Sequence, residues 1–510
     1  MNPATPPIHR SPARVATLLA WLLGSLIACG GGGSPQSPGN APAFTSQPAD
    51  LSVSLGLPAS FTASASGAPA PSYQWQRGSA DIPGATAATY TVAVTTMAEA
   101  GATFSVVASN GSGRATSRAA QLTVTPPAVP AAYADLYPAL QGILAGYDQG
   151  ITAAWNGQKS PVSFGGELLT ANANRGRQLL GPNVMTAVRL ELDRLRALGL
   201  QSVTVCMGFP VLYPAFFQFN GDPEDAAALL AFYTSVAAEI RQRNMKLVVE
   251  SSLLFPGVYS TGSGFNLAGY YATLNVGQLG AAHADMLALL AVQVQPDWIN
   301  LGSEPDTQAT LFGNPTLGTP SGFAALIGQE VARIRAAGSS VPLGAGVGTW
   351  QANGGSFLAA LAGTGIDYID LHVYPVNLGF LDRLTQLTDA AQALGKPVAI
   401  SEAWLSKERD AEFTQYNAAT DQTIFSRDSF SFWAPLDQAF LGALVTFAHW
   451  KHLLYLSPFW TKFLHAYIDF GAAQGLTPAQ VTTLADQAAS VALQAGAVSS
   501  TGAYYRNALR

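Results

Sequence analysis

Short apolar runs and longer amphipathic stretches alternate along the chain from about residue 133 to its end. The runs have the length of strands and are apolar at successive positions, which is typical of strands buried on both faces of a parallel sheet. Amphipathic stretches between them predict helices at residues 184–198, 226–242, 322–337, 381–394 and 436–451, with a terminal helix at 478–495. We expect eight strands, at residues 162–169, 202–209, 246–254, 298–302, 342–348, 368–374, 397–401 and 454–460.

This alternation predicts an α/β domain over residues 133–510, a (β/α)8 barrel of the TIM type. An open, doubly wound sheet is the structural alternative. A Gly-rich phosphate loop would favour that alternative, but Phe164-Gly-Gly-Glu167 after the first strand lacks the required spacing. The barrel is therefore the preferred fold for this part of the chain.

Residues 43–125 follow a different pattern, with many Ser, Thr, Ala and Val residues in short alternating runs separated by turn residues. This pattern predicts an all-β sandwich. The order of the runs resembles an immunoglobulin-like domain, in which Trp75 would be the core tryptophan. By that resemblance Ala63 and Val106 replace the two sandwich cysteines, and Phe104 replaces the corner tyrosine. The Pro-rich residues 126–132 are expected to form a linker.

The N-terminal residues predict export from the cytoplasm. Arg10 and Arg14 precede an apolar stretch over residues 15–28 that is too short for a membrane-spanning helix and fits a signal peptide. The small residues before Cys29 resemble a bacterial lipobox, which implies a signal peptide over residues 1–28 and lipidation of Cys29. A plain signal peptide is the alternative.

Several expectations follow from the lipobox resemblance. Residues 29–42, rich in Gly, Pro and Ser, would be a flexible tether from the membrane. Gly30 after the cysteine resembles the pattern sorted to the outer membrane, so we expect a lipid-anchored protein of the bacterial cell envelope, on the periplasmic or surface side. Cys206 would then be the only other cysteine, an inert thiol in an apolar strand.

The composition limits the classes of molecule that this protein is expected to bind. Only 11% of the 510 residues are charged and the net charge is −6. No basic surface for nucleic acid is therefore expected. The sequence contains neither a convincing zinc-ligand spacing nor a Gly-x-Ser-x-Gly elbow for acyl transfer. We expect no metal and no cofactor.

Two glutamates carry the candidate chemistry. Trp298-Ile-Asn-Leu-Gly-Ser-Glu-Pro-Asp306 and Pro397-Val-Ala-Ile-Ser-Glu-Ala-Trp404 are apolar runs that each end in a glutamate, Glu304 and Glu402. A carboxylate at the tip of a buried strand is costly to desolvate, so its position calls for a reason. In a barrel both strand tips open into one cleft, and paired carboxylates there suit the hydrolysis of a glycosidic bond.

The positions of these glutamates resemble the large clan of retaining (β/α)8 glycosidases, known as clan A. The resemblance covers about residues 133–510 and rests on Ser303-Glu304-Pro305, Ile400-Ser401-Glu402 and the strand order. It implies that Glu304, after strand four, is the acid/base and that Glu402, after strand seven, is the nucleophile. The expected separation of the two carboxyl groups is about 5–5.5 Å.

The same resemblance suggests residues that bind a sugar. Asp370-Leu-His372-Val-Tyr374 ends strand six, and its period of two places His372 and Tyr374 on one side. Tyr374 would donate a hydrogen bond to the nucleophile, and His372 would neighbour the substrate or the acid/base. Trp460 would line the sugar-binding floor, with Trp350 and Trp404 as further candidates.

One residue departs from the clan pattern. Most members have Asn before the acid/base glutamate, whereas this chain has Ser303, which reaches less far toward a sugar hydroxyl. Glu250 and Glu167, at the ends of strands three and one, are further acidic groups expected in the cleft, where either could bind sugar hydroxyls; Glu250 is the candidate substrate-binding residue of the two.

The favoured interpretation is a retaining glycoside hydrolase that acts on a polysaccharide or oligosaccharide outside the cytoplasm. Its rival is a catalytically inactive surface lipoprotein that binds glycans, and Ser303 is the feature in the rival's favour.

Overall fold

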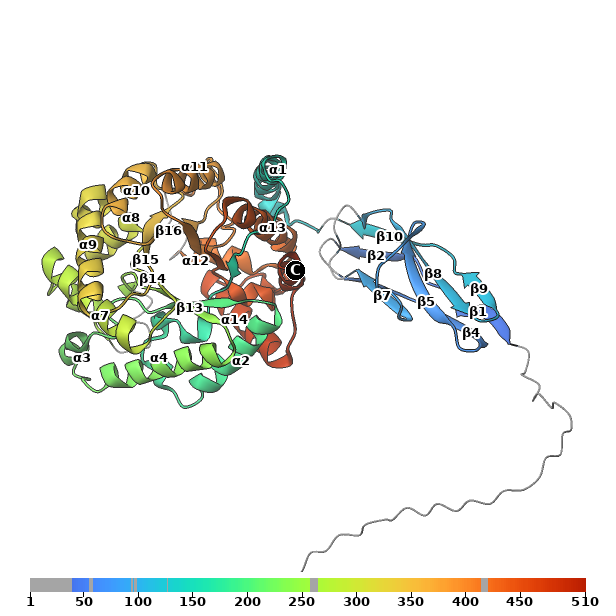
Figure 1. The fold of residues 1–510 in the computed structure, drawn as a ribbon, viewed down its shortest axis with the longest axis horizontal. Coiled ribbons are helices and arrows are strands. Elements are labelled where there is room, and N and C mark those ends of the chain that lie inside the picture. Colours follow the sequence, from blue (N-terminus) through green and yellow to red (C-terminus); the bar gives the residue numbers. More distant parts are fainter. Residues whose placement is uncertain are drawn as a thin grey trace, which may run out of the picture.

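A computed structural model describes residues 39–54, 58–92, 95, 99–125, 127–256, 265–413 and 421–510. It contains an all-β immunoglobulin-like domain followed by a barrel of eight parallel strands surrounded by helices (Figure 1). The proposed signal peptide, Cys29 and most of the tether lie outside the described residues. Within the described ranges, no helix is long and apolar enough to cross a membrane.

The first domain is a sandwich built around Trp75. This side chain is fully buried in β5 and packs with Phe61 and Phe104, and its indole Nε1 donates to the carbonyl of Ala87 at 2.9 Å. Ala63 and Val106, expected at the positions of the missing cysteines, are also buried in this core. The strands are β1 (Asn40–Ser46), β2 (Leu51–Ser54), β3 (Ala59–Thr62), β4 (Ser64–Ala68), β5 (Ser72–Arg77), β6 (Ala80–Asp81), β7 (Thr89–Val92), β8 (Thr103–Asn110), β9 (Gly113–Thr116) and β10 (Ala120–Thr125).

All eight expected barrel strands are present. They pair in the order β11-β18-β17-β16-β15-β14-β13-β12, and every pairing is parallel. A further parallel bridge between Glu167 and Thr204 joins the segment after β11 to β12 and completes the ring. The strands are β11 (Ser163–Phe164), β12 (Ser202–Cys206), β13 (Lys246–Glu250), β14 (Trp298–Asn300), β15 (Leu343–Gly348), β16 (Tyr368–Val373), β17 (Val398–Ala403) and β18 (Tyr455–Pro458).

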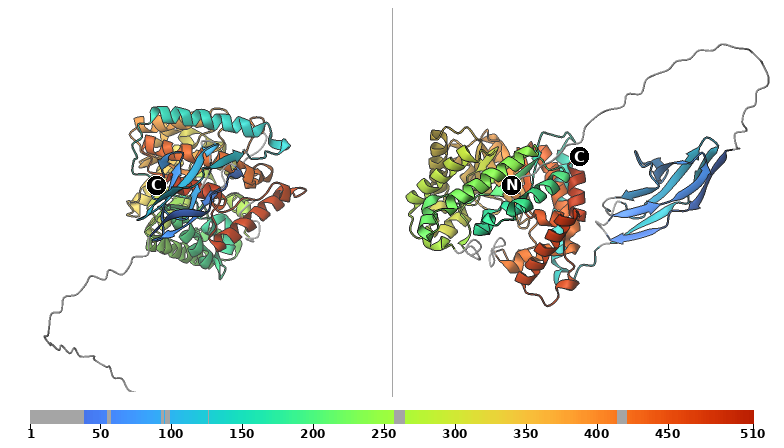
Figure 2. Two further views of the ribbon diagram at one scale, coloured as in Figure 1. Left: turned by 90° about the vertical axis from the view of Figure 1, so that its right-hand side faces the viewer. Right: turned by 90° about the horizontal axis from the view of Figure 1, so that it is seen from below.

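Helices pack outside the ring, as both views in Figure 2 show. The six helices named from the sequence are present, with ends shifted by at most a few residues. No sequence range was named in advance for α1, α7 or α10. The helices are α1 (Leu136–Ala154), α2 (Val184–Ala197), α3 (Pro214–Asn220), α4 (Asp225–Gln242), α6 (Leu267–Tyr271), α7 (Val276–Gln293), α8 (Pro305–Phe312), α9 (Pro320–Ala336), α10 (Gly354–Ala362), α11 (Phe380–Ala393), α12 (Gln422–Phe425), α13 (Ala434–Lys451), α14 (Pro478–Ala495) and α15 (Ser500–Ala508).

The barrel interior changes from apolar to polar along its axis. Tyr368 on β16 packs with Val248, Ala399 and Tyr455 in one buried cluster. Because side chains alternate along a strand, Asp370 and His372 follow Tyr368 on the same inward face. Both are buried and polar. The apolar end therefore closes the barrel, and the polar end lies at the carboxyl ends of the strands.

Candidate active site

The paired carboxylates lie where β14 and β17 end. Glu402 is part of β17 and lies in register with His372 of β16. Glu304 follows β14 and directly precedes α8, whose first residue is Pro305. Proline suits the first helical position because its fixed φ matches the helix and it has no N–H to leave unpaired. The chain therefore turns from strand to helix at Glu304 and holds this side chain at the barrel mouth.

The hydroxyl of Tyr374 connects the two carboxylates. It lies 2.7 Å from Oε1 of Glu304 and 3.0 Å from Oε2 of Glu402. His372 Nδ1 lies 2.9 Å from Oε1 of Glu304 and 3.6 Å from Oε2 of Glu402. Carboxylate oxygens of the pair and this ring nitrogen all lie within 4.8 Å of one another. A tyrosine carries one hydroxyl proton, so it donates to one carboxylate at a time.

Their surroundings give the two carboxylates different pKa values. Burial alone would raise the pKa of Glu304, but the hydrogen bond and charge of His372 and the hydrogen bond from Tyr374 lower it. Burial raises the pKa of Glu402 to about 7, against the attraction of His372. The surroundings thus lower the pKa of Glu304 and raise that of Glu402. This order is the reverse of the one that the expected roles require at the moment of attack.

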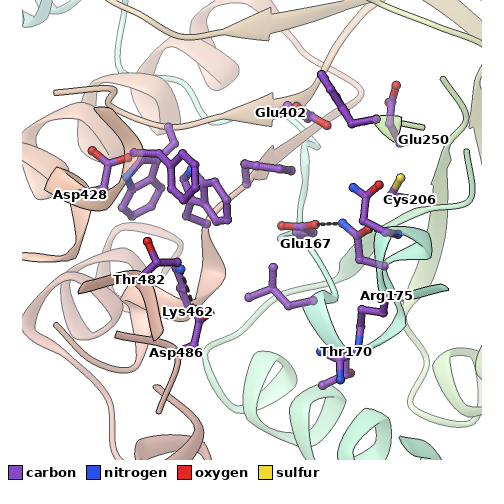
Figure 3. A pocket seen from close by; sticks show the side chains of 18 of the residues that line it. Glu167, Thr170, Arg175, Cys206, Glu250, Glu402, Asp428, Lys462, Thr482 and Asp486 are labelled. Carbon is purple, nitrogen blue, oxygen red and sulfur yellow. Dashed lines mark hydrogen bonds and ion pairs between the residues drawn. The ribbon is translucent and has the colours of Figure 1, made fainter. Parts of the chain in front are cut away.

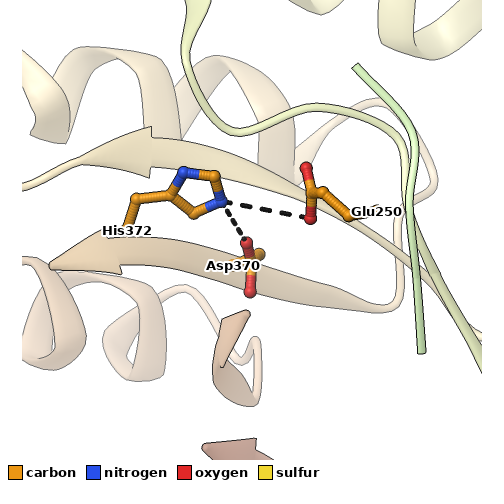
Figure 4. Close-up of side chains that lie close together, drawn as sticks. All are labelled: Glu250, Asp370 and His372. Atoms are coloured by element: carbon orange, nitrogen blue, oxygen red, sulfur yellow. Dashed lines mark ion pairs between the residues drawn. The ribbon is translucent and has the colours of Figure 1, made fainter. Parts of the chain in front are cut away.

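A buried polar layer supports the pair from below. The amide nitrogen of Asn300 lies 2.5 Å from Oε2 of Glu250 and 2.5 Å from Oδ2 of Asp370, and the Ser401 hydroxyl lies 3.0 and 2.6 Å from the same two oxygens. His372 Nε2 faces this layer, 3.4 Å from Asp370 and 4.0 Å from Glu250 (Figure 4), and lies 3.0 Å from the Ser401 hydroxyl.

The titratable groups of this layer are acidic side chains and one histidine. Burial opposes a charge on His372, but the surrounding carboxylates, Glu402 foremost, raise its pKa well above the usual value. Burial raises the pKa of Glu250 well above its usual value as well. The ring of His372 lies between Asp370 beneath it and Glu304 above it, at 3.4 and 2.9 Å. This fixes the ring orientation toward the pair.

The carboxylate–histidine groups are the candidate metal ligands among the described residues. They are Glu250, Asp370 and His372, and Glu304, His372 and Glu402. Both groups share His372, whose Nδ1 lies 2.9 Å from Oε1 of Glu304 and whose Nε2 lies 3.0 Å from the Ser401 hydroxyl. Both ring nitrogens thus already take part in the hydrogen-bond network.

Ser303 lines the cleft, but its hydroxyl is engaged by the buried layer. Its side chain is buried, and its hydroxyl donates to Oδ2 of Asp370 at 2.7 Å. Ser303 thus belongs to the supporting layer, as Glu250 does.

The three candidate tryptophans occupy different places. Trp460 lines the cleft and stacks on Phe425 at 6.0 Å. Trp404 also lines the cleft, although it is only 1% exposed. Trp350 is not among the cleft-lining residues; its indole donates to Oδ2 of Asp306 at 2.9 Å, and its ring lies against Tyr374. Trp350 is thus positioned to orient Tyr374, and contact of its partly exposed ring with a sugar stays a prediction.

The cleft is a cavity of about 750 Å³ that runs from the paired carboxylates toward α14 (Figure 3). Besides the expected residues, it is lined by Arg175, Asp428, Lys462 and Asp486. The sequence gave no signal for these four, because they lie in loops and on helix faces where polar residues are ordinary. Cys206 lines the cleft too, and burial raises the pKa of its thiol, which makes it a poor nucleophile.

No family model matches this chain. A segment of 96 residues is 43% identical to Endoglucanase C of Cellulomonas fimi and covers 18% of this chain and 9% of that protein. The chain thus spans about a tenth of the curated relative that it matches. Solved structures with similarity include a chimeric titin Z1Z2 tandem, 33% identical over 17% of this chain and 51% of that one, with a TM-score of 0.16. Immunoglobulin domains 1–5 of Sidekick-1 are 28% identical over 17% of this chain and 20% of theirs, also with a TM-score of 0.16.

Proposed function

We propose that this chain is a glycoside hydrolase that retains the configuration of the sugar it cleaves. The observation that carries the proposal is the pair Glu304 and Glu402, with oxygens within 4.8 Å and one tyrosine between them, at the carboxyl ends of barrel strands. A separation near 5 Å leaves no room for a water between carboxylate and sugar, so it favours direct attack. The partial similarity to Endoglucanase C supports the same reaction class.

In the proposed reaction Glu402 attacks the anomeric carbon, and the bond from that carbon to the leaving oxygen breaks. Glu304 gives its proton to the leaving oxygen. A water then attacks the glycosyl-enzyme, Glu304 takes its proton, and the bond to Glu402 breaks. His372 and Tyr374 would orient Glu304 and Glu402 through the contacts they already make.

The reaction requires a proton on Glu304 at the start, whereas the free protein favours Glu402. Tyr374 offers a path between them: its hydroxyl accepts the proton of Glu402 while giving its own to Glu304. This transfer leaves Glu402 ionised for attack and Glu304 protonated. We propose that a glycosidic oxygen bound near Glu304 favours this state, because it offers the proton on Glu304 an acceptor.

The first test is turnover of polysaccharides and oligosaccharides by the purified protein, with the anomer of the first product followed by NMR. Release of the product with the substrate's own anomeric configuration is expected. Release of the opposite anomer would rule out the retaining mechanism.

A glycan-binding protein without turnover is the second candidate, because Ser303 is turned into the supporting layer and supplies no donor to the sugar. Binding of an oligosaccharide in calorimetry with no product after prolonged incubation would favour it.

We also propose that the protein is lipid-anchored through Cys29 in the outer membrane of the bacterial cell envelope. Mass spectrometry of the mature N-terminus should find a lipidated Cys29, and Cys29→Ser should release the protein from the membrane fraction. An unmodified soluble N-terminus in the wild type would exclude the anchor.

A further inference from the structure

Glu167 is a buried acid in the cleft wall that the proposed reaction does not use. It lies just after β11, is 3% exposed and lines the cavity. Oε1 accepts a hydrogen bond from Nδ2 of Asn172 at 2.6 Å. Oε2 is buried with no hydrogen-bond partner among the described residues. Figure 3 shows this carboxyl group between Glu402 on one side and the pair Lys462 and Asp486 on the other.

A second buried glutamate in the same wall shows what a purely structural acid looks like. Both carboxylate oxygens of Glu191 accept hydrogen bonds, from the backbone of Leu169 and from the backbone and hydroxyl of Thr170. Those bonds tie the segment after β11 to α2. Glu167 has no comparable set, and a buried polar atom without a partner is costly. A ligand that supplies the missing partner would offset that cost.

Glu167 is close enough to Glu402 for their charges to interact. Burial raises the pKa of Glu167 well above its usual value, the hydrogen bond from Asn172 opposes this, and the charge of Glu402 adds to the rise. Glu167 and Glu402 line the same cavity, so a sugar ring bound there for attack by Glu402 could bring a hydroxyl group to the unpartnered oxygen of Glu167.

The charged groups around the cleft are mostly acids. Lys462 is paired with Asp486 at 2.7 Å, and Arg175 lies at the exposed rim. The acidic side chains that line the cavity are Glu167, Glu191, Glu250, Glu304, Glu402, Asp428 and Asp486. A carboxylate or sulfate on the substrate would be buried among these carboxyl groups beside a Lys462 that is already paired with Asp486, and burying an anion without its own cation is costly.

We propose that Glu167 is a specificity-determining residue: its free carboxyl oxygen binds a hydroxyl group of the sugar ring next to Glu402, and the acidic wall around it excludes sugars that carry a carboxylate or a sulfate. This inference rests on the proposed function, since it takes the sugar attacked by Glu402 as the ligand. It names the substrate class as polysaccharides of uncharged or amino sugars.

The test uses Glu167→Gln, which keeps the size of the side chain and removes its ability to become charged. Cello-oligosaccharides, chitosan oligosaccharides and oligogalacturonides serve as neutral, cationic and anionic probes. We expect turnover of a neutral or cationic probe, and a loss of kcat/KM of about tenfold to a hundredfold in Glu167→Gln. On an analogue that lacks the contacted ring hydroxyl, the same variant should lose less than about threefold.

Glu408→Gln is the matched control. Glu408 is also a buried glutamate whose carboxylate oxygens have no partner among the described residues, but it is not part of the cleft wall. This variant should retain wild-type kcat/KM. Thermal unfolding of both variants shows whether a loss of kcat/KM comes from a lost contact or from a destabilised fold.

A binding measurement keeps the two proposals apart. Calorimetric titration of the probes into Glu402→Gln and into Glu402→Gln/Glu167→Gln reports contact with Glu167 without any turnover. If the wild type shows no turnover but binding weakens in the double variant, the proposed hydrolase function is overturned and the assignment of Glu167 is kept. Any of three results would overturn the assignment of Glu167. They are an unchanged affinity in the double variant, an equal loss of kcat/KM on the deoxygenated analogue, and a preference for oligogalacturonides.

Discussion

At the scale of single residues, distance alone is a poor guide to chemistry in this molecule. Ser251, His283 and Glu330 are arranged like a hydrolytic triad: the serine hydroxyl lies 3.1 Å from His283 Nε2, and Nδ1 lies 2.8 Å from Glu330. All three are at most 1% exposed, and the Ser251 hydroxyl also lies 3.2 Å from the carbonyl of Met207. None of them lines the cleft. A nucleophile needs access to substrate, so this group joins β13 to α7 and α9 and has no catalytic role.

The roles of the paired glutamates can be separated by their variants. Glu402→Ala should lose turnover by several orders of magnitude and regain it with azide, which would give a glycosyl azide of inverted configuration. Glu304→Ala should retain the first step on substrates with good leaving groups, because these need little protonation. Stopped-flow release of an aryl leaving group measures that step. The reverse pattern of rescue would assign the nucleophile to Glu304, the acid that the free protein holds ionised.

Glu408 should make the stability of the barrel depend on pH. Burial raises the pKa of Glu408 from about 4.5 to about 7. The folded state therefore binds this proton more tightly than the unfolded state, and its contribution to the free energy of unfolding falls as pH rises from about 4.5 to about 7. Glu408→Gln removes this loss. The free energy of unfolding of the variant, relative to that of the wild type, should therefore be about 2–3 kcal/mol higher at pH 8 than at pH 4. Denaturant unfolding at both pH values measures the difference; equal curves would contradict it.

At the scale of elements, the alternation of apolar runs predicted all eight strands because parallel strands buried on both faces leave an unmistakable continuous pattern. Seven helices were expected between the eight strands, but no range was named for α7. Its exposed side carries Ala281 and Val292 besides Asp285, and apolar residues there weaken the contrast with the buried face. The paired glutamates were visible as polar ends of apolar runs. Glu167 could not be ranked above Glu250 from the sequence. The structure leaves one buried oxygen of each without a partner among the described residues, and differs in that the other oxygen of Glu250 is held by Asn300 and Ser401 in the buried layer.

We expect the stability of the loop after β17 to depend on one buried lysine. Lys407 is fully buried, forms an ion pair with Asp437 of α13 and lies 3.5 Å from Asp428. Lys407→Met would leave two buried acids without their cation, so we expect a loss of about 3–5 kcal/mol in the free energy of unfolding. Arg333→Met is the control, because Arg333 and Asp285 form a half-exposed pair worth less than about 1 kcal/mol. Denaturant melts that show similar losses for both variants would argue against the central role of Lys407.

At the scale of the whole molecule, the two domains have separate cores. The cluster around Trp75 contains residues of the sandwich alone, and the large cluster of the barrel begins after the linker (Figure 1). Every residue that lines the cleft lies at or beyond Glu167. The sequence predicted this division because the change in pattern near residue 126 coincides with a Pro-rich stretch. A domain with its own core is expected to fold by itself.

Removal of the sandwich should therefore leave the chemistry intact. A chain that begins at Ala131 retains every cleft-lining residue, so we expect wild-type kcat and KM on soluble oligosaccharides, within about twofold. Any loss should be confined to insoluble or cell-bound polysaccharide, where an extra domain can add reach or weak contacts through effective concentration. Parallel assays of the full and shortened chains on a soluble oligosaccharide and on an insoluble glucan measure both effects. A shortened chain that is folded by circular dichroism but slow on the soluble substrate would show that the sandwich helps to shape the cleft, and its role as a spacer would then be wrong.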